Sequence, residues 1–181
     1  LLVDGVLPTV TAVSSTSNNG SYKFDDTIPI TITFSEAVTV SGTPQLTLET
    51  GLSDAVVNYT SGSGGSTLTF NYTVLSGHNS SNLDYVSSSA LSLNSGSIAD
   101  AAGNNATLTL VSPGATTSLG SNKSIVIDGI VPTISIVTST SSDGNYSAGD
   151  VIPISILFSE SVTVSGTPQL TLETGSSDAV V

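Results

Sequence analysis

The chain lacks cysteine, methionine and tryptophan, and only two of its 181 residues are lysine or arginine. Without cysteine it has no disulfides, no thiol nucleophile and no thiolate ligands for metals. The single histidine, His78, lies in the polar stretch "LSGHNSSN", where we expect a solvated loop side chain rather than a member of a catalytic triad. There is no phosphate-binding loop and no zinc-ligand spacing, so the sequence argues against an enzyme.

Positive charge is also scarce: 14 acidic residues against two basic ones give a net charge of −12 at pH 7. A surface of this sign repels phosphate backbones and anionic lipid headgroups, so we expect no nucleic acid partner. No apolar run approaches the roughly 20 residues that a transmembrane helix needs, so we expect no membrane insertion in this segment. Charged residues make up only 9% of the chain, and its polarity comes from Ser, Thr, Asn and Gly.

What the chain does contain is an internal repeat. The stretch "SGTPQLTLETG" occurs at 41–51 and again at 165–175, a shift of 124 positions (165 − 41). At that shift residues 1–57 align with 125–181 without a gap, and 37 of the 57 pairs are identical. This unit has the length of an independent domain, whereas helical and leucine-rich solenoids repeat every 20 to 50 residues or so.

The repeat predicts three parts. Residues 1–4 form the end of a preceding repeat and its linker, residues 5–128 form a complete repeat, and residues 129–181 form the N-terminal part of a second, truncated repeat. We therefore expect the segment to belong to a longer array. Its partners would be identical repeats in the same chain and, in a fibre, other copies.

Period-two alternation of apolar and polar residues is the dominant local pattern, and it predicts strands. Val, Ile, Thr, Tyr and Phe fill these segments, and clusters of Gly, Asn, Asp and Ser separate them. About seven strands per repeat indicate an all-β fold of tandem immunoglobulin-like antiparallel β-sandwich domains. The predicted strands are 9–13, 27–34, 44–50, 54–60, 66–74, 90–98, 106–111 and 123–128. The aromatic side chains expected in the core are Phe34, Phe70, Tyr72 and Phe158.

Three carboxylates are expected at the pole where the chain enters the sandwich. Asp4 lies in the linker, Glu36 follows the strand at 27–34, and Asp100 opens the turn after the strand at 90–98. Calcium takes 6–8 oxygen ligands, including amide carbonyls, so Asn104 could add one. Turn capping is the alternative role for each carboxylate. Counting the equivalents in the second copy, the predicted calcium ligands are Asp4, Glu36, Asp100, Asn104, Asp128 and Glu160.

These segments also carry a family resemblance. The linker "IDGIVPT", the stretch "IPISILFSESVTVSGTPQLTLETG" and the turn "DAAGN" resemble bacterial immunoglobulin-like tandem repeats of giant cell-surface and adhesin proteins, especially SwmB-like repeats. The resemblance covers the whole chain and implies an extracellular or cell-surface location. Relatives in the broader adhesin family hold calcium at domain junctions through a linker aspartate and a "DxxGN" turn, which implies Asp4, Asp128 and residues 100–104 here. The linker departs from the commoner "DT" by reading "DG".

Two functions of different classes follow. The first is a structural spacer, stalk or filament segment of a large secreted or cell-surface bacterial protein, with calcium stiffening the junctions between repeats. The alternative is an adhesive binding module that recognises a polysaccharide or a host or surface ligand. An adhesive module predicts an exposed aromatic or flat threonine array, and the aromatic content of 5% favours the spacer. A third role, as an accessory to a distant catalytic domain, stays open.

Overall fold

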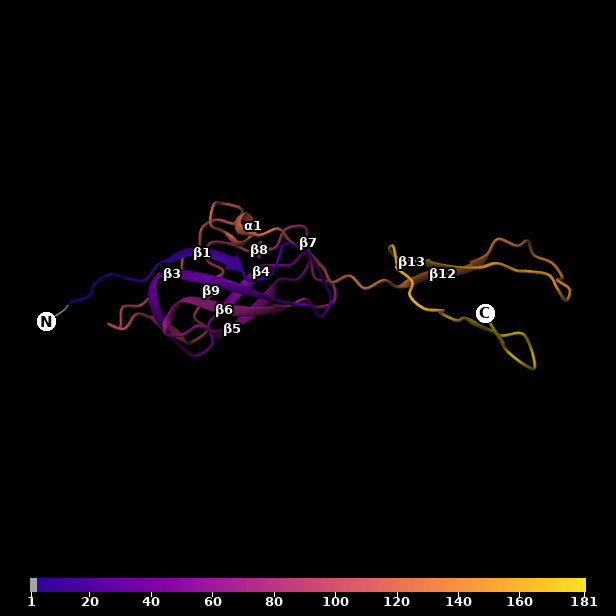
Figure 1. Cartoon of the computed structure of the whole chain (residues 1–181), viewed down its shortest axis with the longest axis horizontal. Helices are drawn as coiled ribbons and strands as arrows, with labels where there is room; N and C mark the ends of the chain where they lie inside the picture. Colours follow the sequence, from indigo (N-terminus) through magenta and orange to yellow (C-terminus); the bar gives the residue numbers. More distant parts are fainter. Residues whose placement is uncertain (1–2) are drawn as a thin grey trace. The chain divides into compact units, whose positions relative to one another are not determined.

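The computed structural model describes residues 3–181 and divides the chain into two compact units, unit 1 (Leu1–Val131) and unit 2 (Pro132–Val181). Both units are built from strands, with one short helix among the described residues (Figure 1). The predicted all-β fold class with antiparallel sheets is confirmed. Within residues 3–181, no helix is both long and apolar enough to cross a membrane.

Unit 1 contains eleven of the described strands, several of them very short, and the helix α1 (Leu119–Asn122), which Ser118 caps. The strands are β1 (Val10–Ser15), β2 (Gly20–Lys23), β3 (Thr27–Ser41), β4 (Gln45–Glu49), β5 (Ala55–Ser61), β6 (Gly65–Thr73), β7 (Asn79–Ser80), β8 (Asp84–Tyr85), β9 (Leu91–Ser92), β10 (Ser97–Ala99) and β11 (Ile125–Asp128).

Strand β5 links two antiparallel layers of unit 1. Its first residues, Ala55 to Asn58, pair with β4, whereas Tyr59 and Ser61 pair with β6. The order of strands is therefore β1-β3-β6-β5-β4-β8, with β10 paired to β3 and β9 paired to β4. A smaller sheet has the order β2-β11-β7, and its β2–β11 pair is parallel, which the sequence did not predict.

The core lies on one face of β3 and β6, where the period-two pattern places alternating apolar side chains. The cross-strand pairs are Ile28 with Tyr72, Ile30 with Phe70 and Ile32 with Leu68. All six side chains are at most 1% exposed. Burial of one such apolar side chain contributes about 1.5–3 kcal/mol to the free energy of unfolding. The predicted burial of Phe34, Phe70 and Tyr72 is confirmed, whereas Phe158 is only partly buried.

The predicted strand at 106–111 is wrong. Thr107 forms only an isolated bridge with Thr9, and this segment contains no assigned strand. Its backbone N–H groups donate to three separate parts of the chain: Thr107 to the Pro8 carbonyl, Ala106 to Ile98 and Leu110 to Ser88. A continuous ladder needs one neighbouring strand, so alternation alone was insufficient here.

Two predicted strand boundaries also change. The segment at 90–98 is interrupted by Asn94 and Ser95, whose φ angles of 45° and 63° lie in the left-handed region. It therefore forms the two short strands β9 and β10, which pair with different partners. Strand β3 runs on to Ser41, so Glu36 lies within a strand and not after one.

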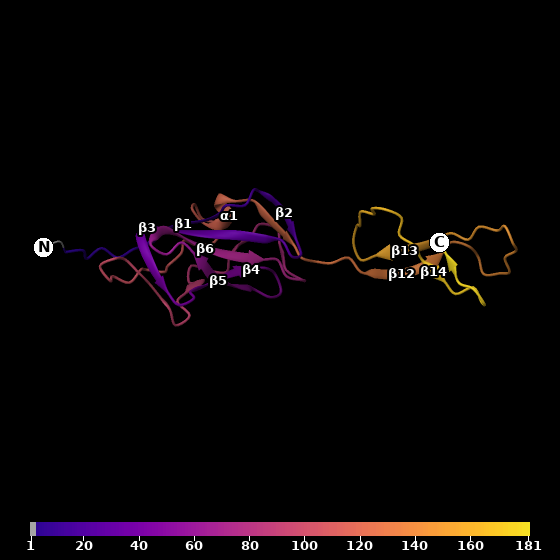
Figure 2. The same ribbon diagram turned by 60° about the horizontal axis from the view of Figure 1, so that its bottom comes forward.

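Unit 2 contains two separate two-stranded sheets (Figure 2). One sheet pairs β12 (Ile134–Ser139) with β13 (Ile154–Phe158), and the other pairs β14 (Thr171–Leu172) with β15 (Ala179–Val180). Many apolar side chains of these strands are exposed, including Ile136, Ile156 and Val180. Unit 2 therefore has the hairpins of a sandwich but not its closed core.

Candidate metal centre

The segment that leads into β1 is hydrogen-bonded to two other parts of unit 1. The Thr9 N–H donates to Ser35 Oγ at 3.0 Å, and the Ser35 N–H donates to the Thr9 carbonyl at 2.8 Å. On the other side, the Thr107 N–H donates to the Pro8 carbonyl at 2.8 Å. These bonds hold the segment against β3 and against the residues after β10, close to where Asp4 lies.

Asp100 follows β10 and is held by the turn that it opens. The Asn104 backbone N–H and side-chain Nδ2 donate to the two carboxylate oxygens of Asp100, each at 2.8 Å. Burial raises the pKa of Asp100, but the hydrogen bonds from Asn104, Ala102 and Gly103 outweigh it, so that the pKa lies below its ordinary value. Asp100 is therefore a fixed, ionised carboxylate at neutral pH.

Glu36 lies in an irregular part of β3, because the pairing of β3 with β6 shifts register between Thr33 and Val38. Burial raises the pKa of Glu36, and the negative charges of Asp4 and Asp100 raise it further. Burial and the negative charges of Asp4 and Asp100 thus disfavour the ionised form of Glu36. A bound cation would offset the repulsion between these carboxylates.

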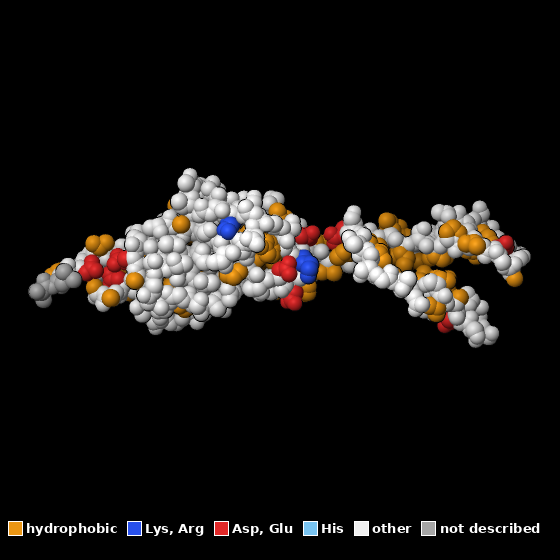
Figure 3. Space-filling view, in the orientation of Figure 1, with side chains coloured by type: hydrophobic (Ala, Val, Ile, Leu, Met, Phe, Trp, Pro, Cys, Tyr) orange, Lys and Arg blue, Asp and Glu red, His pale blue; other side chains and the backbone are white. Residues whose placement is uncertain are grey.

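The structure brings the three predicted carboxylates of unit 1 together. Asp4, Glu36 and Asp100 each offer one oxygen, and these oxygens lie within 4.8 Å of one another. Acidic side chains gather at this end of unit 1 in Figure 3. Asn104 joins the group, because its Nδ2 also donates to the Asp4 carbonyl at 3.2 Å. Within residues 3–181 the one salt bridge joins Lys23 to Asp26, so no basic side chain neutralises this cluster.

The other two predicted ligands lie outside this cluster. Asp128 ends β11, and its Oδ1 accepts a hydrogen bond from the Ile130 N–H at 3.3 Å, just as Asp4 Oδ1 accepts one from Val6 at 3.1 Å. Glu160 follows β13 in unit 2, and its Oε1 is buried without a hydrogen-bond partner among the described residues. A counterpart of Asp100 would be residue 224 (100 + 124), which this sequence does not include. Calcium ligation by Asp128 and Glu160 stays a prediction.

The prediction that His78 is a solvated loop side chain is wrong. His78 is buried, and only 7% of the residue is exposed. The imidazole stacks on the ring of Tyr72, with centroids 5.7 Å apart, and its Nδ1 lies 2.9 Å from the Tyr72 hydroxyl oxygen. Burial lowers the pKa of His78 and raises that of Tyr72. The polar residues around His78 gave no signal of this, because its partner lies on β6.

Comparison with known proteins adds a family to this geometry. Residues 5–117 match the family described as bacterial Ig-like domain. The chain belongs to this family. This membership confirms the predicted immunoglobulin-like fold. Such domains are typical of cell-surface proteins and are usually non-catalytic structural modules. The comparisons match no curated protein and no solved structure.

Proposed function

We propose that the chain is a spacer, stalk or filament segment of a large secreted or cell-surface bacterial protein, built from SwmB-like tandem repeats with boundaries at 5–128 and 129–181. The observation that carries this function is the repeat itself, with 37 of 57 aligned pairs identical, in a chain of the bacterial Ig-like family. A series of independently folded domains sets a distance between its two ends. The function is therefore mechanical and requires no catalytic group.

Calcium is the ion that we propose to stiffen the segment between repeats. The donors of the cluster are all hard oxygen atoms, and oxygens bound to one calcium ion at 2.3–2.6 Å lie at most about 5 Å apart. The carboxylate oxygens of Asp4, Glu36 and Asp100 meet that condition, since they lie within 4.8 Å of one another. The side-chain carbonyl of Asn104 would add a ligand once its amide turns, because its Nδ2 now faces the cluster and donates to Asp100 Oδ2 and to the Asp4 carbonyl.

The mechanical effect follows from where the three carboxylates originate. Asp4 belongs to the entering segment, Glu36 to β3 and Asp100 to the turn after β10. Without a cation, like charges at this separation repel, so the segment around Asp4 is pushed away from unit 1. Calcium supplies the positive charge that ties the segment to two other elements. Asp128 and Glu160 would repeat this arrangement at the next repeat.

Thermal unfolding with calcium and with a chelator tests this proposal. Calcium at a hundred times its dissociation constant adds about 2.7 kcal/mol to the free energy of unfolding, or roughly 10 °C in the melting temperature of a domain of this size. Asp4→Asn and Asp100→Asn should lose most of that rise. Asp143→Asn, which changes an exposed aspartate outside the cluster, is the matched control and should keep it.

Glu36→Gln gives the sharpest result, because its effect should change sign. In chelator the variant removes a repelled charge and should melt above the parent chain, whereas in calcium it removes a ligand and should melt below it. Equal melting temperatures with calcium and chelator, in the parent and in every variant, would show that these carboxylates are ordinary turn residues.

A further inference from the structure

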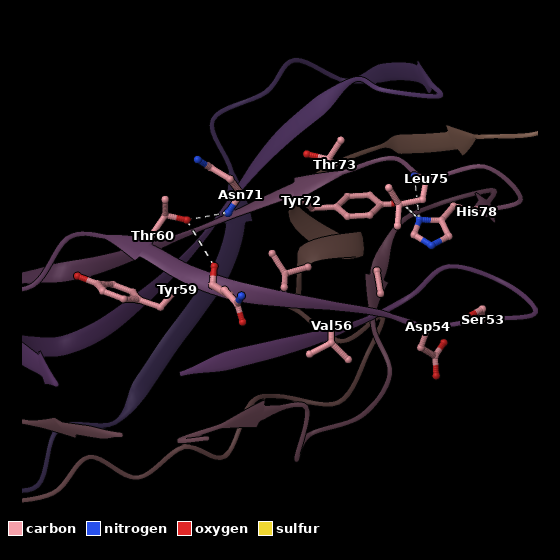
Figure 4. A pocket seen from close by; sticks show the side chains of 13 residues that line it. Ser53, Asp54, Val56, Tyr59, Thr60, Asn71, Tyr72, Thr73, Leu75 and His78 are labelled. Carbon is pink, nitrogen blue, oxygen red and sulfur yellow. Dashed lines mark hydrogen bonds between the residues drawn. The ribbon is translucent and has the colours of Figure 1, made fainter. Parts of the chain in front are cut away.

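A groove of about 520 Å³ runs along β5 in unit 1, and none of the acidic cluster residues lines it (Figure 4). It exists because β5 pairs with β6 only at Tyr59 and Ser61, and its earlier residues pair with β4 instead. The wall opposite β5 is formed by the end of β6 together with Leu75 and His78. Polar and apolar groups both line the groove, and Asp54, Val56 and Leu75 are exposed there.

His78 contributes an unusual group to this groove. The Leu75 N–H points to Nδ1 at 3.3 Å, and an N–H can only donate, so Nδ1 is an acceptor and the proton of the neutral ring lies on Nε2. Figure 4 shows this second nitrogen directed toward the β5 side of the groove. Among residues 3–181 Nε2 has no hydrogen-bond partner, and it is not one of the fully buried unpaired atoms, so it reaches the open space of the groove. This N–H is therefore available to donate to a ligand in the groove.

The charges around the groove restrict which ligand fits. Asp54 places a carboxylate at the start of β5, and neither of the chain's two basic residues, Lys23 and Lys123, lines the groove. An anionic ligand would therefore be repelled. An alcohol hydroxyl can accept from the His78 Nε2–H and can donate to a carboxylate such as that of Asp54. The half-buried ring of Tyr59 and the side chain of Leu75 offer apolar surface for the C–H faces of a sugar.

We propose that this groove binds a short stretch of neutral glycan. The interaction goes beyond the spacer function and does not depend on calcium. Residues 53–57 recur unchanged as 177–181, so the β5 wall of the groove is encoded again 124 residues later (177 − 53). An array would then present the same weak site at regular intervals, and many such sites acting together bind far more tightly than one. A stalk of this kind adheres along its length to a neutral polysaccharide.

The test is a titration of the isotope-labelled chain with maltohexaose and with laminarihexaose, followed by amide chemical shifts in NMR. At least one of these neutral glucans should shift amides of 53–60, 71–75 and 78 with millimolar affinity, equally in calcium and in chelator. Trigalacturonate, an anionic oligosaccharide, should leave the same amides unchanged. Because the readout is independent of calcium, a failure of the metal proposal would not affect it.

Two variants assign the binding to the groove. His78→Asn retains a side-chain oxygen that can accept from Leu75 and Tyr72 but loses the Nε2 donor. It should weaken binding about fivefold, with changes in the spectrum of the free chain confined to residues near the lost ring, such as Tyr72. Asp54→Asn should weaken it by about tenfold, since the hydrogen bond to a charged acceptor is lost. Asp178→Asn is the matched control in the identical stretch of unit 2, where no described strand supplies the opposite wall, and should have no effect.

Three results would overturn the proposal. In the first, neither glucan shifts the groove amides at a concentration about 20-fold above the expected millimolar dissociation constant. Binding weaker than that is roughly beyond the limit of a specific site. The second is shifts that both variants leave unchanged. The third is a response of the groove to a peptide with the sequence of residues 66–74 but not to the glucans, because the open edge of β5 would then be a strand-binding site.

Discussion

Unit 1 and unit 2 begin with nearly the same sequence and form the same first hairpin. In unit 1, β1 pairs with β3 and is interrupted by a bulge between Val10 and Ala12. In unit 2, β12 pairs with β13, and the bulge falls between Ile134 and Ile136, which are the same positions 124 residues later. The local sequence therefore determines both the register of this strand pair and the position of its bulge.

Burial separates the two units. Ile32 is fully buried in unit 1, whereas its counterpart Ile156 is 39% exposed, and Val13 is fully buried whereas Val137 is 52% exposed. In unit 1 the second edge of β3 is occupied by β6, but a counterpart of β6 would begin at residue 189 (65 + 124), which this sequence does not include. The comparison teaches that the hairpin is a local structure and that the core depends on strands distant in sequence.

The largest expected effect is in hydrogen exchange. Amides of Ile30 to Phe34 in β3 should exchange only through global unfolding of unit 1, with a free energy of about 5 kcal/mol or more. Those of Ile154 to Phe158 in β13 should exchange with almost no protection, because few buried contacts hold that hairpin. Mass spectrometry of peptic fragments measures both segments in one sample. Equal protection of the two would contradict the stated role of β6.

A matched pair of core substitutions should give the next largest difference. Ile32→Ala leaves a cavity between β3 and β6 and should lower the free energy of unfolding of unit 1 by about 2–5 kcal/mol. Ile156→Ala should leave the stability of unit 1 unchanged, since Ile156 belongs to unit 2 and is partly exposed. Urea unfolding followed by tyrosine fluorescence compares the two variants with the parent chain. A similar loss in both would mean that the units do not unfold separately.

The smallest expected effect concerns pH and unit 1 alone, because unit 2 contains no histidine. Burial holds the pKa of His78 below its ordinary value of 6.5, so the folded state favours the neutral ring. This contribution to stability is fully present above pH 6.5 and is lost as the pH falls from there through the folded pKa. His78→Asn should flatten the pH dependence of the urea midpoint across that window. A parent chain with no such dependence would show that His78 is not held neutral.

How far the sequence predicted the fold depends on the range of the interactions. Strands β4, β5 and β6 were predicted to within about one residue at each end, because alternation records which face is buried. Strand β3 was predicted from its correct start, but its far end at Ser41 was missed. The segment at 106–111 has the same alternation but hydrogen bonds to three different segments. A short window of sequence does not show which distant segments will accept these hydrogen bonds. The parallel β2–β11 pair was missed for the same reason, since its strands lie about a hundred residues apart.

For the candidate metal site, too, features set by nearby residues were predicted, and features that depend on distant contacts were not. Asp4, Glu36 and Asp100 were predicted to meet because each lies at or near the end of a strand at one pole, and the structure places their oxygens together. The position of Glu36 inside β3 was not predicted, since it depends on the register shift between β3 and β6. His78 was misjudged, because its burial depends on stacking with Tyr72 and not on its polar neighbours.

The central claim is that calcium stiffens a spacer, and small-angle X-ray scattering of a chain extended to two complete repeats tests it most directly. In calcium the account predicts a longer and more rigid particle than in chelator, and Asp128→Asn at the second junction should abolish the difference. Identical scattering profiles in calcium and in chelator would contradict the claim.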